Sequence, residues 1–166
     1  MTFTQSDRVT PSEQITIPFA ANEQEEFFEM NQIKVSRSKH VVVNGVREQQ
    51  SFTTPWLDAS TVYGTDTATA NALRTFSQGK LKVSSDDLLP RNPDGSFISG
   101  DIRVNENLIL VTIHTIFHRL HNRICDWMVE YDNTISDEDL YHIGRNMVIG
   151  HLQKTTFDEW LPLLIG

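Results

Sequence analysis

The stretch GDIRVNENLILVTIHTIFHRLHNRICDWMVEY, residues 100–131, decides the fold class of this chain. From about Val104 onward its apolar residues recur at spacings of three and four, which is the period of a helix with one buried face. These residues are Ile109, Ile113, Ile116, Phe117, Leu120, Ile124, Trp127 and Met128. A second helical pattern follows the acidic start Ser136-Asp-Glu-Asp139, which has the form of a capping box. We therefore expect two long neighbouring helices and a mainly α-helical fold.

Shorter elements are expected before residue 100. The stretch His40–Glu48 predicts a tight hairpin, because Asn44-Gly45 suits the two positive-φ positions of a type I′ turn. Asp66 or Thr67 can cap a short helix, which we expect to reach Phe76.

Composition excludes several classes of protein. The 166 residues carry 14 basic and 22 acidic side chains, a net charge of -8, and no stretch concentrates Lys and Arg, so nucleic acid is not an expected partner. No apolar run is long enough to span a membrane, and the first residues lack the pattern of a signal peptide. The single cysteine, Cys125, follows Ile124 on the apolar side of the first long helix, and we expect a buried, inert thiol.

The stretch Thr54–Ser60 places oxygen atoms at every second residue. They are the Thr54 hydroxyl, the Trp56 main-chain carbonyl, the Asp58 carboxylate and the Ser60 hydroxyl. This spacing suits an extended loop around calcium, which takes six to eight oxygen ligands. The spacing alone nevertheless favours an ordinary polar loop, because a calcium loop usually brings more carboxylates than one.

Arg103 and Glu106 lie three residues apart at the expected start of the first long helix. On a helix they would share one face, so a guanidinium and a carboxylate could point into the same cleft. Taken alone, the spacing favours a simpler interpretation, in which Glu106 offsets the helix dipole and pairs with Arg103 at the surface.

His114, His118 and His121 share one face of the same helix, as metal ligands can. In a hydrolytic zinc helix a glutamate directly follows the first histidine, whereas here that residue is Thr115. We therefore expect ordinary core or surface histidines.

Taken in order, the motifs of residues 50–166 resemble those of the animal-type haem peroxidases. The motifs are Thr54-Pro-Trp-Leu-Asp-Ala-Ser-Thr-Val-Tyr-Gly64, Ala72-Leu-Arg74, Gly79-Lys-Leu81, Leu89-Pro90, Gly100-Asp-Ile-Arg-Val-Asn-Glu106, His114-Thr-Ile-Phe117 with His121-Asn-Arg123, Ser136-Asp-Glu138 and Leu161-Pro-Leu-Leu-Ile-Gly166. The resemblance implies a mainly α fold with short β-hairpins, in which residues 50–166 are the central part of a haem peroxidase domain. Residues 1–49 would be an irregular segment with a hairpin in the same domain.

The resemblance also assigns roles to individual residues. It implies calcium ligands at Thr54, Trp56, Asp58 and Ser60. It places Arg103 over a haem b group on the peroxide side, as a catalytic and haem-binding residue. It places Glu106 at the haem rim, where several family members form an ester bond to the haem.

The function implied by the resemblance is oxidation of a small phenolic or halide electron donor by hydrogen peroxide, with a role in the response to oxidative stress and an extracellular or lumenal location. The family's peroxide-side histidine lies N-terminal to the matched region, and its iron-ligating histidine lies beyond Gly166. The chain is therefore expected to be a partial domain that needs flanking segments. The alternatives are a fragment of a haem-dependent fatty-acid dioxygenase, and a non-catalytic relic that acts as an interaction module.

Overall fold

The computed structural model describes residues 14–18, 32–36, 40–49, 51 and 53–166, and the chain divides into two compact units, Met1–Ser51 and Phe52–Gly166. The first unit holds two antiparallel strand pairs. Strand β1 (Gln14–Pro18) pairs with β2 (Gln32–Ser36), and β3 (His40–Val43) pairs with β4 (Val46–Gln49). Asn44 and Gly45 join β3 to β4 with φ angles of 52° and 78°, which confirms the predicted type I′ hairpin.

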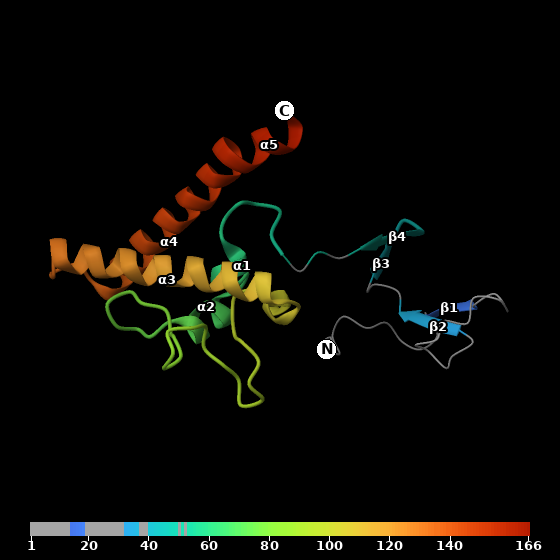
Figure 1. Ribbon diagram of the computed structural model, residues 1–166, viewed down its shortest axis with the longest axis horizontal. Coiled ribbons are helices and arrows are strands. Elements are labelled where there is room, and N and C mark those ends of the chain that lie inside the picture. Colours follow the sequence, from blue (N-terminus) through green and yellow to red (C-terminus); the bar gives the residue numbers. More distant parts are fainter. Residues whose placement is uncertain (1–13, 19–31, 37–39, 50, 52) are drawn as a thin grey trace. The chain divides into compact units, whose positions relative to one another are not determined.

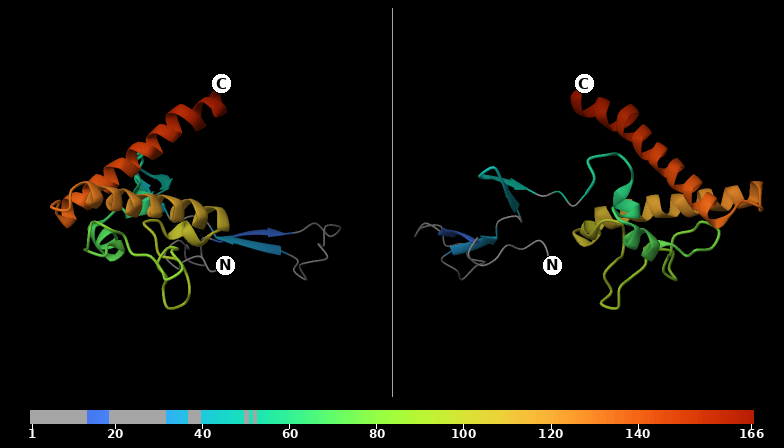
Figure 2. Two further views of the ribbon diagram at one scale, coloured as in Figure 1. Left: turned by 60° about the vertical axis from the view of Figure 1, so that its left-hand side comes forward. Right: turned by 180° about the vertical axis from the view of Figure 1, so that it is seen from behind.

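Two long helices form the second unit, as expected. Helix α3 (Leu108–Tyr131) and helix α4 (Asp137–Lys154) pack against each other, and α4 then leaves α3 at an angle (Figures 1 and 2). The Ser136 hydroxyl accepts a hydrogen bond from Asp139 N, so the predicted capped start of α4 is confirmed. A π-helical segment, η4 (Thr155–Trp160), and the short helix α5 (Leu161–Ile165) continue α4 as one rod.

Two short helices pack beneath α3 and complete the core. Helix α1 (Ser60–Tyr63) contacts α3, and helix α2 (Thr67–Leu73) follows it directly. The buried core joins these three elements to α4 and to the loop after α2. Its members are Ala59, Val62, Tyr63, Leu73, Leu81, Ile124, Tyr141 and Val148.

Helix α2 begins as predicted but ends earlier. The Asp66 carboxylate accepts a hydrogen bond from Thr69 N at 2.9 Å and caps the helix. The expected extension to Phe76 is wrong, because the helix stops at Leu73. Arg74 adopts an extended conformation there and forms a β-bridge with Leu81, which turns its side chain toward α4.

Helix α3 also begins later than the sequence predicts. A short 3₁₀ turn, η3 (Ile102–Asn105), replaces the expected helical start at Val104. Asn107 then takes an extended conformation, and its side chain accepts a hydrogen bond from Leu110 N at 3.0 Å. An asparagine cap of this kind satisfies one of the free N–H groups at a helix start, so α3 begins at Leu108.

The predicted buried face of α3 is only partly right. Ile124 is buried, and Phe117, Leu120 and Met128 pack against the core. Ile109, Ile116 and Trp127, however, are 70%, 57% and 48% exposed, respectively. The buried face also carries three histidines, Thr115 and Cys125, which the apolar pattern did not include. This face is buried because main-chain carbonyl groups of residues 79–82 lie against it and accept hydrogen bonds from two of the imidazoles.

The Asn107 cap leads to a first prediction. Asn107→Ala should lower the free energy of unfolding by about 1 kcal/mol, because the Leu110 N–H loses its acceptor. Urea unfolding can be followed by tryptophan fluorescence, since all three tryptophans lie in the second unit. Asn146→Ala, at an exposed position inside α4, is the control and should not reduce stability. Equal losses in the two variants would contradict a capping role.

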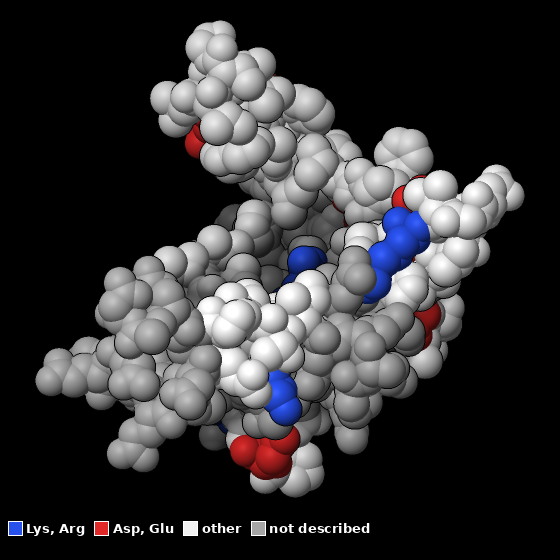
Figure 3. All heavy atoms as spheres, turned by 90° about the vertical axis from the view of Figure 1, so that its right-hand side faces the viewer, with Lys and Arg blue, Asp and Glu red and all other residues white. Residues whose placement is uncertain are grey.

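None of the described helices is both long and apolar enough to cross a membrane. On the face seen in Figure 3, the described Lys and Arg side chains stand in small separate groups rather than in a continuous basic surface.

Candidate functional site

The oxygen atoms of the Thr54–Ser60 loop converge as the sequence predicts. The Thr54 hydroxyl donates to Asp58 Oδ1 at 2.9 Å, lies 3.1 Å from Ser60 Oγ and is 3.5 Å from the Trp56 carbonyl oxygen. Burial alone would raise the pKa of Asp58, but hydrogen bonds from Ser60 and Thr54 outweigh it and the pKa falls below its ordinary value. The loop therefore presents an ionised carboxylate among three neutral oxygen atoms.

Arg103 is held by Asp101, not by Glu106. The Arg103 Nε donates to Asp101 Oδ1 and Oδ2 at 3.0 and 3.1 Å, and Nη2 donates to Oδ2 at 2.6 Å. The expectation of a surface pair between Arg103 and Glu106 is thus wrong. Asp101 can bond the arginine because its backbone is extended and it caps η3, so its carboxylate also accepts from Arg103 N. This clamp fixes a guanidinium whose side chain is 60% exposed.

Glu106 lies on the same side of η3 as Arg103. Its backbone N–H donates to the Arg103 carbonyl oxygen at 3.0 Å, so the two residues are one 3₁₀ turn apart, and side chains three residues apart are eclipsed in such a turn. The shared face expected from the sequence is therefore present, although a 3₁₀ turn rather than an α-helix creates it.

The oxygen loop and the Arg103 segment meet at Gly100. The Gly100 N–H donates to the Val62 carbonyl oxygen at 3.2 Å, which docks the segment on α1. A Cβ atom at Gly100 would lie 2.2 Å from Gly64 N and 2.5 Å from the Ser60 carbonyl oxygen, so only glycine permits this approach. Ser60 belongs to the oxygen loop, and the two candidate segments are thus parts of one packed unit.

The three α3 histidines are core residues, as predicted. His114 Nδ1 donates to the Leu110 carbonyl at 2.7 Å and His118 Nε2 to the Lys82 carbonyl at 2.6 Å. His121 Nε2 donates to the Gly79 carbonyl at 2.8 Å, which leaves Nδ1 to accept a hydrogen bond from the Tyr63 hydroxyl at 2.9 Å. No group of three or more His, Cys, Asp or Glu residues could hold a metal ion in the described part of the chain.

Burial controls the protonation of the residues around His121. It lowers the pKa of His121 to about 4, so the imidazole is neutral near pH 7. It also raises the pKa of the Cys125 thiol to about 11. Cys125 is fully buried and its thiol lies 3.6 Å from the Leu140 carbonyl oxygen, which agrees with the predicted inert thiol.

Sequence reasoning missed two polar residues that organise this region. The first is Asp101, which lies two positions before Arg103, and an acidic residue at that distance from an arginine in a turn can signal such a clamp. The second is Arg74, whose buried guanidinium pairs with Asp137 at 2.8 Å and Glu138 at 2.7 Å. These partners lie more than sixty residues away, and no local pattern indicates them.

Comparison with known proteins gives consistent results. The animal haem peroxidase family model matches residues 2–166. Peroxidasin of Drosophila melanogaster is 39% identical over 142 residues, which cover 72% of this chain and 9% of that protein. Alpha-dioxygenase PIOX of Pisum sativum is 40% identical over 112 residues, which cover 68% of this chain and 17% of that protein. The crystal structure of the Oryza sativa fatty acid alpha-dioxygenase matches with a TM-score of 0.74 at 28% identity, over 93% of this chain and 26% of that chain.

Proposed function

We propose that this chain, which belongs to the animal haem peroxidase family, forms the central part of a haem site at which hydrogen peroxide oxidises a small phenolic or halide donor. The chain spans only 9% of the fly peroxidasin and 17% of the pea dioxygenase named above. The observation that carries this proposal is the clamp between Asp101 and Arg103. A guanidinium held in a fixed direction can stabilise the negative charge that develops on peroxide as its O–O bond breaks. Haem b, when bound, would supply the redox chemistry.

Exposed apolar residues next to η3 in the sequence support the proposed haem group. Ile102, Leu108 and Ile109 are 58%, 83% and 70% exposed, and they lie next to Arg103 and Glu106 in the sequence. An apolar surface beside a cation and a carboxylate suits a flat apolar ring with charged edge groups. Arg103 would face the peroxide, and Glu106 would hold the rim of the ring. We propose that Glu106 holds it through an ester bond.

Calcium is the second cofactor that we propose. The convergence of the oxygen atoms of Thr54, Trp56, Asp58 and Ser60 supports it, and calcium accepts such mixed oxygen shells with loose geometry. Because Ser60 and the Gly100 segment are in contact, an ion in this loop would also stabilise the position of the Arg103 clamp.

The calcium proposal gives a second prediction. Calcium should raise the melting temperature of the chain above its value in chelator, and Asp58→Asn should remove most of this shift, because the carboxylate is the only charged ligand of the four. Asp94→Asn is a matched control, since Asp94 accepts hydrogen bonds from Ser96 much as Asp58 accepts one from Ser60 N. Equal loss of the calcium effect in both variants would remove the basis for this site.

Residues 1–49 and the regions beyond the chain complete the proposed domain. The family match begins at residue 2, which supports a common domain for residues 1–49 and 50–166. In this proposal the peroxide-side histidine and the iron ligand come from flanking segments, as the resemblance implies. On the basis of the same resemblance, we propose an extracellular or lumenal location.

The direct test is a graft. Residues 54–166 would replace the matching segment of the Drosophila peroxidasin domain, which supplies both haem-site histidines by the same resemblance. We expect the graft to bind haem and to oxidise a phenolic donor with peroxide. A folded, haem-loaded graft without turnover would contradict the peroxidase proposal and favour a non-catalytic relic.

A fatty-acid dioxygenase is the second candidate, and the likeness to the pea and rice enzymes favours it. The same graft, made in the rice enzyme, separates the two candidates. Oxygen uptake with palmitic acid in the rice graft, together with an inactive peroxidasin graft, would identify a dioxygenase segment. The reverse pattern would identify a peroxidase segment.

A further inference from the structure

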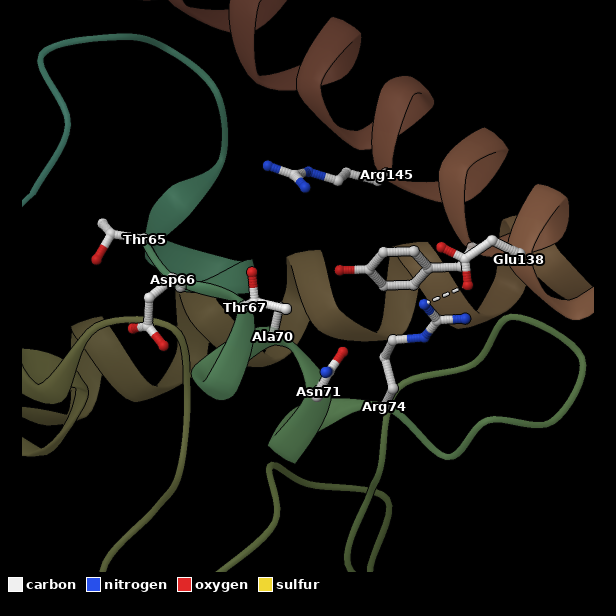
Figure 4. A pocket seen from close by; sticks show the side chains of 10 residues that line it. Thr65, Asp66, Thr67, Ala70, Asn71, Arg74, Glu138 and Arg145 are labelled. Atoms are coloured by element: carbon white, nitrogen blue, oxygen red, sulfur yellow. Dashed lines mark hydrogen bonds and ion pairs between the residues drawn. The ribbon is translucent and has the colours of Figure 1, made fainter.

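A polar cleft lies between α4 and the connection of α1 with α2, and no residue of η3 lines it. It has a volume of about 310 Å³, and its walls include Thr65, Asp66, Asn71, Arg74, Tyr141 and Arg145. Figure 4 shows Arg145 extending from α4 toward the connection that carries Thr65, with Arg74 and Glu138 joined to each other at the other end. The size is at the lower limit of small-molecule sites, and the lining is polar.

Most charges around this cleft are already compensated. The Arg74 guanidinium pairs with Asp137 and Glu138, and the Asp66 carboxylate accepts hydrogen bonds from Thr69 N and Oγ1 at 2.9 and 2.7 Å. Arg145, by contrast, makes no ion pair within the described part of the chain. Its guanidinium lies over the Tyr63 ring at 5.4 Å from the centroid, a contact that orients it without neutralising it.

Tyr141 supplies a second polar group beside Arg145. The residue is 4% exposed, and its buried hydroxyl interacts with Arg145 but has no hydrogen-bond acceptor among the described residues. Its ring is held by Arg74 stacking at 4.0 Å and by an edge contact with Tyr63 at 6.0 Å between centroids, so the hydroxyl has a fixed position. A buried hydroxyl without an acceptor is rare, because it has lost its bonds to water.

We propose that this cleft binds a small carboxylate, with its two oxygen atoms on the Arg145 guanidinium and one of them also accepting a hydrogen bond from the Tyr141 hydroxyl. The planar guanidinium matches a carboxylate through two parallel hydrogen bonds, which a compact cation cannot offer. The ligand supplies the counter-ion that Arg145 lacks, and the acceptor that the Tyr141 hydroxyl lacks, among the described residues. This site does not involve η3 or the proposed haem group. The carboxylate proposal can therefore be tested independently of the peroxidase proposal.

Acetate is the probe, and the ¹⁵N-labelled 166-residue chain is titrated with it at constant ionic strength against chloride. We expect saturable shifts of the Arg145 Nε–H signal and of the Asn71 signals. Arg145→Gln and Tyr141→Phe should each weaken acetate binding about tenfold or more, equivalent to losing one charge-assisted contact. Arg145→Lys should bind acetate with an affinity between those of the wild type and Arg145→Gln. Lysine keeps the positive charge but cannot form the two parallel hydrogen bonds of a guanidinium.

Arg123→Gln is the matched control. Arg123 also stacks on an aromatic ring, Trp127 at 5.2 Å, but lines no part of the cleft, and its loss should leave acetate binding unchanged. Shifts that rise without saturation, or equal affinity in wild type and Arg145→Gln, would overturn the proposal. Tighter binding of phosphate than of acetate would overturn the carboxylate assignment. The spectrum recorded without acetate shows whether each variant is folded. If Tyr141→Phe does not fold, the Arg145 variants alone decide the test.

Discussion

Arg103→Ala is expected to slow the reaction of the haem-loaded peroxidasin graft with hydrogen peroxide by about 100- to 1,000-fold, the usual effect of removing a preorganised charge-stabilising group. Haem should remain bound, because an exposed apolar surface remains beside η3 in this variant. The rate is measured by stopped-flow absorbance as a function of peroxide concentration, and the haem content by absorbance after extraction.

The clamp makes this prediction more specific. Burial would raise the pKa of Asp101, but hydrogen bonds from Arg103 outweigh it and lower the pKa, so the carboxylate is ionised. Asp101→Asn should therefore leave Arg103 charged but less well fixed, with a loss of rate smaller than that of Arg103→Ala. Arg119→Ala removes another exposed arginine that pairs with an aspartate, Asp87 at 2.8 Å, and should react normally. If haem-loaded Arg103→Ala reacts with hydrogen peroxide at the normal rate, Arg103 does not have the role that we propose.

The sequence predicts the helices better than the way they pack. The helical period and the Ser136 cap are local properties, so α3, α4 and the turn between them could be inferred directly. The buried face of α3 could be inferred only in part, because carbonyl groups of residues 79–82 select the histidine face, and these residues are far from α3 in the sequence. The isoleucines of the opposite face remain exposed in the described structure.

In the candidate site, too, local sequence predicts the features within one segment but not the contacts between segments. The oxygen atoms of Thr54, Asp58 and Ser60 converge within one short loop, which needs no distant partner to bring them together. Their alternating spacing suggested such a site, although taken alone it favoured an ordinary polar loop. The contact between Ser60 and Gly100 depends on the docking of two separate segments, and no periodicity encodes it. For Arg103, the preference for Glu106 came from α-helical spacing, whereas the backbone is a 3₁₀ turn capped by Asp101.

Acidification from pH 7 to pH 4 is expected to destabilise the second unit by about 3 kcal/mol through His121 alone. The pKa of this imidazole is about 4 in the folded chain, against about 6.5 for an unperturbed histidine. Between these values the unfolded chain binds a proton that the folded chain excludes, so the stability is complete above the unfolded pKa and falls as the pH drops toward the folded one. Burial also lowers the pKa of His118, which acts in the same direction.

Protonation of the imidazole costs free energy, because both of its nitrogen atoms already form hydrogen bonds. Protonated Nδ1 would face the Tyr63 hydroxyl, which would have to stop donating to it, inside a site with no access to water. Urea unfolding at several pH values between 7 and 4 measures the slope. His121→Gln should be less stable at pH 7 but should show a flatter slope, whereas Asn146→Ala, which changes a side chain without a titrating group at an exposed position in α4, should keep the wild-type slope. An unchanged slope in His121→Gln would mean that other groups cause the acid sensitivity.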